Sequence, residues 1–150
     1  NLAGGVQFKY PPPEANRGAY GYAVVVIYRT GTRPPNADRN VDDFVREYEK
    51  ESKIVNIPME SVSKPQYLED DFRLLKPAFE DLQRRGARVV VCLLNFDGYA
   101  NVKYASDSIC LPTQCVKWSN LIKPPRNYAT SLLVKINYKL GGVNHTLASR

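Results

Sequence analysis

The chain is poor in the residues that most often carry out catalysis or bind metal ions. It has a single histidine, His145, and three cysteines that show no C-x-x-C spacing. One histidine near the end of the chain argues against Ser-His-Asp and Cys-His catalysis. An odd cysteine count without paired spacing argues against a disulfide framework and a zinc site. We therefore expect no metal, no cofactor and a reducing, cytoplasmic environment.

Long apolar runs and nucleotide-enzyme motifs are also missing. No apolar stretch approaches the roughly 18 residues of a membrane helix, so no membrane partner is expected. The GxGxxG and GxxxxGK[ST] patterns of dinucleotide-binding enzymes and P-loop enzymes do not occur. The pairs Asp42-Asp43 and Asp70-Asp71 fall early in expected helices, where the helix dipole explains them better than metal binding does.

Negative charge is scarce relative to positive charge. The 150 residues include 21 Lys and Arg against 15 Asp and Glu, giving a formal net charge of +6, and 43% of them are hydrophobic. This length and composition predict one folded domain. The basic balance favours an anionic partner, such as nucleic acid or an acidic lipid surface, although many basic domains bind neither.

Strands and helices are expected to alternate along the chain. Residues 1–21, punctuated by Gly4-Gly5 and three prolines, are interpreted as a linker. The β-branched runs predict buried strands at 22–28 and 88–94, with weaker strands within 54–65 and at 111–118. Ligands of such folds bind beyond the carboxyl ends of the strands, and both 95–98 and Gln114-Cys115 are expected there.

Four helices are expected between these strands. The first, at about 41–53, would be capped by Asn40, and the second would follow the apolar pattern from Leu68 to Leu82, with a kink or restart at Pro77 and a stop at Gly86. A third would carry Tyr99 and Lys103, and the last would span about 127–140. The alternation predicts an α/β, Rossmann-like fold with a mostly parallel central sheet and helices on both faces.

Two lysine pairs and a glutamine are the most informative residues of the chain. Residues four apart share a helix face, so Tyr99 should project with Lys103, and Lys135 with Lys139. With Gln114, they bring three cations, a phenol and an amide together, which suits a phosphate beside a stacked base. Taken singly, each lysine is equally explained by a solvated helix face or by the helix dipole.

These motifs resemble the MID domain of eukaryotic Argonaute proteins. The resemblance runs from about Tyr22 to Leu147 and is strong from Arg88 onward. Its motifs are Tyr99-Ala100-x-Val102-Lys103, Thr113-Gln114-Cys115-Val116 and Lys135-Ile136-Asn137-x-Lys139-Leu140-Gly141-Gly142-Val143-Asn144. It implies a MID domain at 22–147, with residues 148–150 beginning the connection to a PIWI domain.

The resemblance also implies the roles of individual residues. In that family the domain holds the 5′-terminal nucleotide of a small guide RNA for RNA silencing. Tyr99 would stack on the first base, and Asn120 is a further candidate near the phosphate. The base would be read by Asn95, Phe96, Asp97 and Gly98, with a preference for U and a weaker one for A. The phosphate would be held by Tyr99, Lys103, Gln114, Cys115, Lys135 and Lys139.

The resemblance implies a binding domain rather than an enzyme, because the family's nuclease carboxylates belong to the PIWI domain. The expected partners are the 5′ end of a guide RNA and that PIWI domain, with the isolated domain monomeric. One alternative is a flavodoxin-like enzyme acting on a phosphorylated metabolite, for which Asp97 and Asp107 are the only nearby bases. Another is a protein-interaction scaffold whose basic face is incidental.

Overall fold

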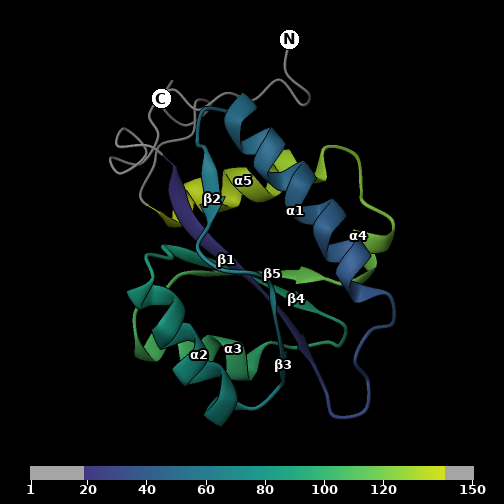
Figure 1. The fold of residues 1–150 in the computed structure, drawn as a ribbon, viewed down its shortest axis with the longest axis vertical. Helices are drawn as coiled ribbons and strands as arrows, with labels where there is room; N and C mark the ends of the chain where they lie inside the picture. Colours follow the sequence, from purple (N-terminus) through teal and green to yellow (C-terminus); the bar gives the residue numbers. More distant parts are fainter. Residues whose placement is uncertain (1–18, 141–150) are drawn as a thin grey trace.

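The computed structural model describes residues 19–140, which form a parallel sheet between two layers of helices (Figure 1). The strands are ordered β2-β1-β4-β5, and β3 pairs with β1 farther along the edge that β2 also occupies. Every strand pair is parallel. The strands are β1 (Tyr20–Tyr28), β2 (Met59–Ser61), β3 (Gln66–Glu69), β4 (Val89–Leu94) and β5 (Thr113–Lys117).

Helices cover both faces of this sheet. On one side lie α1 (Ala37–Ile54), α4 (Ser119–Ile122) and α5 (Tyr128–Lys139), and on the other lie α2 (Phe72–Arg84) and α3 (Ala100–Ser108) (Figure 1). The α/β, Rossmann-like fold expected from the sequence is therefore confirmed. No helix within residues 19–140 is long and apolar enough to cross a bilayer.

The core consists of two clusters separated by the sheet, because successive strand side chains point to opposite faces. On β1, Tyr22, Val24 and Val26 pack toward α1 and α5, while Val25 and Ile27 pack toward α2. Burial on both faces explains why β1 and β4 are almost continuously apolar. Such a sheet leaves few positions for polar chemistry, so function is confined to its edges and loops.

The first strand begins earlier than the sequence suggested. Tyr20 and Gly21, assigned to the linker, belong to β1 and pair with β2. Glycine is required at position 21 because a Cβ there would lie 2.3 Å from the backbone oxygen of Gly86. Residues 1–18 and 141–150 lie outside the described part of the chain. The domain limits, Gly141-Gly142, His145 and the proposed connection at 148–150 therefore stay predictions.

Helix boundaries also differ from the sequence prediction. Asn36, in a left-handed conformation, precedes α1 where Asn40 was expected to cap it, so the helix gains a turn at its start. Leu68 belongs to β3, and α2 starts only after Asp71, whose carboxylate accepts a hydrogen bond from Arg73 N at 2.9 Å. The helix continues through Pro77, since its buried leucine and phenylalanine face outweighs one lost hydrogen bond. Helix α4 was not predicted.

Candidate nucleic-acid interface

A pocket of about 520 Å³ lies along the free edge of β5, between α3 and α5. It takes residues from α3, from residues 111–115 and from the end of α5, so it exists only in the folded chain. Its lining consists of Tyr99, Lys103, Ser106, Asp107, Leu111, Pro112, Thr113, Gln114, Cys115 and Lys139.

Strand β5 presents backbone groups to this pocket because, within residues 19–140, it is the last strand of the sheet. Val90 N donates to Pro112 O, and Trp118 N donates to Leu94 O, so the even-numbered residues of β5 pair with β4. Every second residue of a strand faces the same neighbour. The amide N–H of Cys115 therefore points to the free edge, where it can donate to a ligand.

Helix α3 supplies the aromatic side of the pocket. Tyr99 is the residue before the helix and is 55% exposed, which leaves its ring available for stacking. Lys103 lies one turn later, and its backbone N–H donates to Tyr99 O at 2.9 Å. The ammonium of Lys103 is 3.7 Å from the carboxylate of Asp107, one further turn along the helix. Asp107 thus partly balances the charge of Lys103.

Helix α5 reaches the pocket through the last residue of the helix. Lys139 Nζ donates to Gln114 Oε1 at 2.6 Å and to Thr113 O at 2.8 Å. Gln114 is largely buried, and its amide nitrogen donates to Cys115 O at 3.2 Å. These contacts hold Lys139 and Gln114 against the edge of β5 in fixed positions. Such fixed donors lose little conformational freedom when a ligand binds.

The three lysines act on one another electrostatically. Partial burial lowers the pKa of Lys139, and the charges of Lys135 and Lys103 lower it further. Lys135 does not line the pocket but is close enough to contribute to this field. Like charges that repel one another favour a nearby anion, because its negative charge offsets the repulsion. The pocket is therefore suited to a group with more than one negative charge.

Cys115 lines the pocket, and Cys92 lies next to it on the adjacent strand. Cys92 and Cys115 are directly opposite in the β4–β5 ladder, and their thiols are hydrogen bonded. That hydrogen bond lowers the pKa of Cys115, and Lys139 lowers it further, whereas burial raises the pKa of Cys92 well above its usual range. Cys92 behaves as the small buried hydrophobe expected from the sequence, and all three cysteines are free.

The loop before Tyr99 lines a neighbouring pocket at the carboxyl ends of β4 and β5. Asn95, Phe96 and Asp97 lie there with residues 117–119, around a volume of about 370 Å³. The loop is held by the turn after β1: Asn95 Nδ2 donates to Thr32 O at 2.6 Å, and the Arg29 guanidinium lies 4.6 Å from the centre of the Phe96 ring. A loop fixed in this way can present a defined backbone surface.

The pocket brings together Tyr99, Lys103, Gln114, Cys115 and Lys139, whereas Lys135 does not line it. Two further expectations need correction. Gln114 and Cys115 lie near the start of β5, so the pocket runs along the sheet edge and not beyond the carboxyl ends of the strands. Asn120 lies on α4 and donates to the Tyr128 hydroxyl at 3.3 Å, in a different pocket. The sequence argument considered Asp107 only as a base for the alternative enzyme, although its i,i+4 spacing from Lys103 could have placed it in the phosphate pocket.

Comparison with solved structures identifies proteins of the same fold. Kluyveromyces polysporus Argonaute, solved with a guide RNA, aligns with 92% of this chain and 18% of its own, with a TM-score of 0.79 and 19% identity. The MID domain of Arabidopsis thaliana AGO5 aligns with 85% of this chain and 95% of its own, with a TM-score of 0.53 and 18% identity. At these identities the likeness establishes the fold.

Sequence comparison adds curated relatives, among them an argonaute of rice. Protein argonaute 7 of rice is 42% identical over 65 residues, which make up 41% of this chain and 6% of the rice protein. The chain thus corresponds to a small part of that relative, and no protein-family model matches it. The chain has the fold of an Argonaute MID domain and shares sequence with a plant argonaute, so the resemblance predicted from its motifs is confirmed.

Proposed function

We propose that this chain binds the 5′-phosphorylated terminal nucleotide of a small guide RNA. The observation that carries the proposal is the arrangement at the edge of β5. There Lys139 is fixed by Thr113 and Gln114 within the field of Lys103 and Lys135. The MID fold supports it, since one solved protein of this fold is described with a guide RNA.

The chemistry of a 5′ monophosphate matches this arrangement. A phosphomonoester carries nearly two negative charges near neutral pH, because its second pKa is about 6. Lys103, Lys135 and Lys139 act on it as point charges, while Gln114 and the Cys115 amide donate directional hydrogen bonds. The exposed ring of Tyr99 stacks on the first base, which contributes roughly 1–3 kcal/mol for any base.

The loop of Asn95, Phe96, Asp97 and Gly98 reads the edge of that base. Gly98 has φ +94°, a conformation that permits the sharp turn into α3 and a close approach of the backbone. The Asp97 side chain is exposed, and its carbonyl accepts from Arg29 at 3.4 Å. Backbone groups dominate such a surface. By the resemblance to the family, we expect UMP, and to a smaller degree AMP, to bind better than CMP and GMP.

The wider role follows from the same proposal. The chain would act in RNA silencing in the cytoplasm, as a monomeric domain beside the PIWI domain of a longer protein. It would bind and not cut, with no metal or cofactor required. A Methanocaldococcus Argonaute of similar fold, with a TM-score of 0.52, is described with guide DNA, so the choice between RNA and DNA is part of the test.

An NMR titration with UMP and uridine tests the phosphate contribution. We expect UMP to shift amides around Tyr99, Lys103 and Cys115 with a millimolar to micromolar Kd, about −4 to −8 kcal/mol, since a mononucleotide makes few contacts. Uridine should bind far more weakly, and added salt should weaken UMP binding. Equal shifts with UMP and uridine would show that the phosphate is not recognised.

Titration of all four nucleoside monophosphates in the same buffer tests the loop. Four equal dissociation constants would show that residues 95–98 do not read the base. A preference for GMP or CMP would instead assign the reading to the Asp97 carboxylate, which can accept from the amino groups of guanine and cytosine. A comparison of 5′-phosphorylated RNA and DNA oligonucleotides then reports whether the sugar hydroxyl contributes.

A second candidate function rests on Asp107. Its carboxylate lies in the phosphate pocket, 3.7 Å from the Lys103 ammonium, where an enzyme acting on a phosphorylated metabolite would place a general base. Incubation with simple phosphate monoesters distinguishes the two readings. Release of inorganic phosphate that disappears in Asp107→Asn would favour the enzyme, whereas binding without turnover favours guide recognition.

A further inference from the structure

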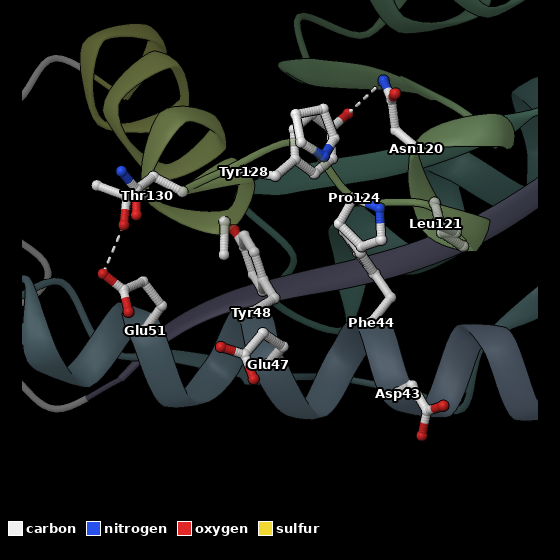
Figure 2. A pocket seen from close by; sticks show the side chains of 13 residues that line it. Asp43, Phe44, Glu47, Tyr48, Glu51, Asn120, Leu121, Pro124, Tyr128 and Thr130 are labelled. Carbon is white, nitrogen blue, oxygen red and sulfur yellow. Dashed lines mark hydrogen bonds between the residues drawn. The ribbon is translucent and has the colours of Figure 1, made fainter. Parts of the chain in front are cut away.

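A second pocket, of about 540 Å³, lies between α1 and the segment that joins α4 to α5 (Figure 2). It shares no lining residue with the phosphate pocket at the edge of β5. Its lining consists of residues 43, 44, 47, 48 and 51 on α1, and residues 120, 121, 124, 125 and 127–130 on the opposite side. The proposed guide binding uses none of these.

Aromatic and apolar groups form the walls of this pocket. Phe44 and Tyr48 are stacked one turn apart on α1, with ring centres 5.8 Å apart and planes inclined by 17°. Facing them are Pro124 and the ring of Tyr128, whose hydroxyl accepts from Asn120 at 3.3 Å (Figure 2). Flat faces of this kind accommodate a planar group.

Carboxylates follow the same face of α1 at intervals of four residues. Asp43 is already paired with Arg46 at 3.0 Å, and Glu51 accepts from the Thr130 hydroxyl at 2.6 Å. Within residues 19–140, Glu47 has neither an ion pair nor a hydrogen-bonding partner. On a chain with a net charge of +6, this pocket is a local concentration of negative charge. It would repel nucleic acid and attract a cation.

The hydroxyl of Tyr48 is a buried polar group in the wall of this pocket. Tyr48 is 0% exposed, and within the described residues its hydroxyl has no hydrogen-bonding partner. In Figure 2 the ring extends from α1 toward Tyr128 and Thr130. A buried polar group without a partner is costly, and such groups are commonly satisfied by a ligand or water. A planar cationic donor entering the pocket could satisfy it.

We propose that this pocket binds an arginine side chain from a partner protein. A guanidinium is planar, always charged and offers five N–H donors, so it can stack on Phe44 or Tyr128 while donating to Glu47 and Tyr48. A lysine ammonium lacks the planar surface that these walls match. The opposite charges of the two pockets let the domain bind a guide at the edge of β5 and a basic protein segment beside α1.

A pair of blocked peptides tests this directly on the whole chain. The probe is acetyl-Gly-Leu-Arg-Leu-Gly-amide, and its control carries citrulline, an uncharged isostere, in place of arginine. NMR titration should show the arginine peptide shifting the resonances of Phe44, Glu47 and Tyr48, with an affinity at least about fivefold higher than that of citrulline. Equal affinity, or shifts only at the edge of β5, would overturn the proposal.

Two variants and one control on α1 sharpen the test. Glu47→Gln keeps the shape of an exposed side chain and should lower the affinity for the arginine peptide at least about threefold. Tyr48→Phe keeps the ring and removes only the hydroxyl, and it should also weaken binding. Asp42→Asn removes an exposed carboxylate of the same helix outside the pocket and should change nothing. Equal losses in Asp42→Asn and Glu47→Gln would reduce the effect to the general charge of α1 and overturn the assignment.

The peptide test is independent of the guide-binding proposal. UMP and the arginine peptide should bind together, since their pockets share no residue. Failure of UMP to bind would leave the arginine result standing, and the reverse also holds. Competition between the two ligands would show that the peptide does not occupy the pocket beside α1.

Discussion

Lys139 shows how one residue can serve both the fold and a binding site. Its ammonium bonds to Thr113 O and Gln114 Oε1 and fixes the end of α5 to the edge of β5. Lys103, by contrast, is exposed and pairs only loosely with Asp107, at 3.7 Å. Lys139 therefore contributes to the stability of the fold, whereas Lys103 contributes little to it.

This difference gives a prediction for single lysine variants. Lys103→Ala should weaken UMP binding by roughly 1.5–3 kcal/mol, the range for hydrogen bonds to charged groups, without changing stability. Lys139→Ala should weaken UMP binding similarly and also lower the unfolding midpoint, because two anchoring bonds are lost. Titration and thermal unfolding measure the two effects. Lys50→Ala, an exposed lysine on α1, is the control.

Asp107→Asn should have the opposite effect on UMP binding to the lysine variants. The carboxylate competes with the phosphate for Lys103 and repels it, so its neutralisation should strengthen UMP binding. Weaker binding in this variant would contradict the proposed geometry. If Lys103→Ala binds as tightly as the unmodified chain while both remain folded, the assigned pocket is wrong.

At the scale of elements, the sequence predicted which strands and helices exist better than it predicted where they begin and end. The buried strands 22–28 and 88–94 and the order of the helices could be read from the sequence because apolar spacing is a local signal. The start of α1 at Ala37 could not, since its preceding Asn36 adopts a left-handed conformation without a capping hydrogen bond. The short helix α4 is too short to show an apolar period of its own, and it packs against α1 and β5.

The cap of α2 gives a prediction at this scale. Asp71 accepts from Arg73 N and from the Arg73 guanidinium, and these hydrogen bonds hold the pKa of its carboxyl below the usual range. Its stabilisation is therefore complete above the pKa of the unfolded chain and is lost as the pH falls through the lower folded value. Asp71→Ala should lower the unfolding midpoint at neutral pH and lessen the loss of stability in acid.

Asparagine at the same position separates the two contributions. Asp71→Asn keeps a side-chain acceptor for the helix start but removes the charge. Its unfolding midpoint at neutral pH should be higher than that of Asp71→Ala. In both variants the midpoint should fall less at low pH than in the unmodified chain. Identical midpoints for all three proteins between pH 3 and 7 would show that this cap contributes nothing measurable.

At the scale of the whole molecule, the fold separates charge that the sequence intermingles. Lys103, Lys135 and Lys139 gather at one edge of the sheet, while Glu47 and Glu51 lie on α1, in the second pocket. The lysine cluster could be anticipated because its motifs keep helical spacing and resemble a known family. The α1 pocket could not, since nothing in the sequence brings Tyr48 and Tyr128 together; only the packing of α1 on α5 does.

The acidic side chains of residues 19–140 are too far apart to form a two-metal site, which predicts that the chain does not cut RNA. Cleavage by a two-metal mechanism needs acidic groups that hold two ions about 4 Å apart. Within residues 19–140 no group of three or more His, Cys, Asp or Glu side chains is placed to hold a metal ion. Asp97 and Asp107, the acids nearest the proposed guide site, line different pockets.

The measurement is incubation of the purified chain with a 5′-phosphorylated RNA in the presence of Mg²⁺ or Mn²⁺. The RNA should remain intact over times in which a trace nuclease control degrades it, while the same RNA binds the chain. Asp97→Asn and Asp107→Asn, purified in parallel, identify any copurifying nuclease, because contamination is indifferent to both substitutions. Cleavage that disappears in either variant would make the domain catalytic, and would mean that a carboxylate lying at the phosphate or the first base acts on the bound strand.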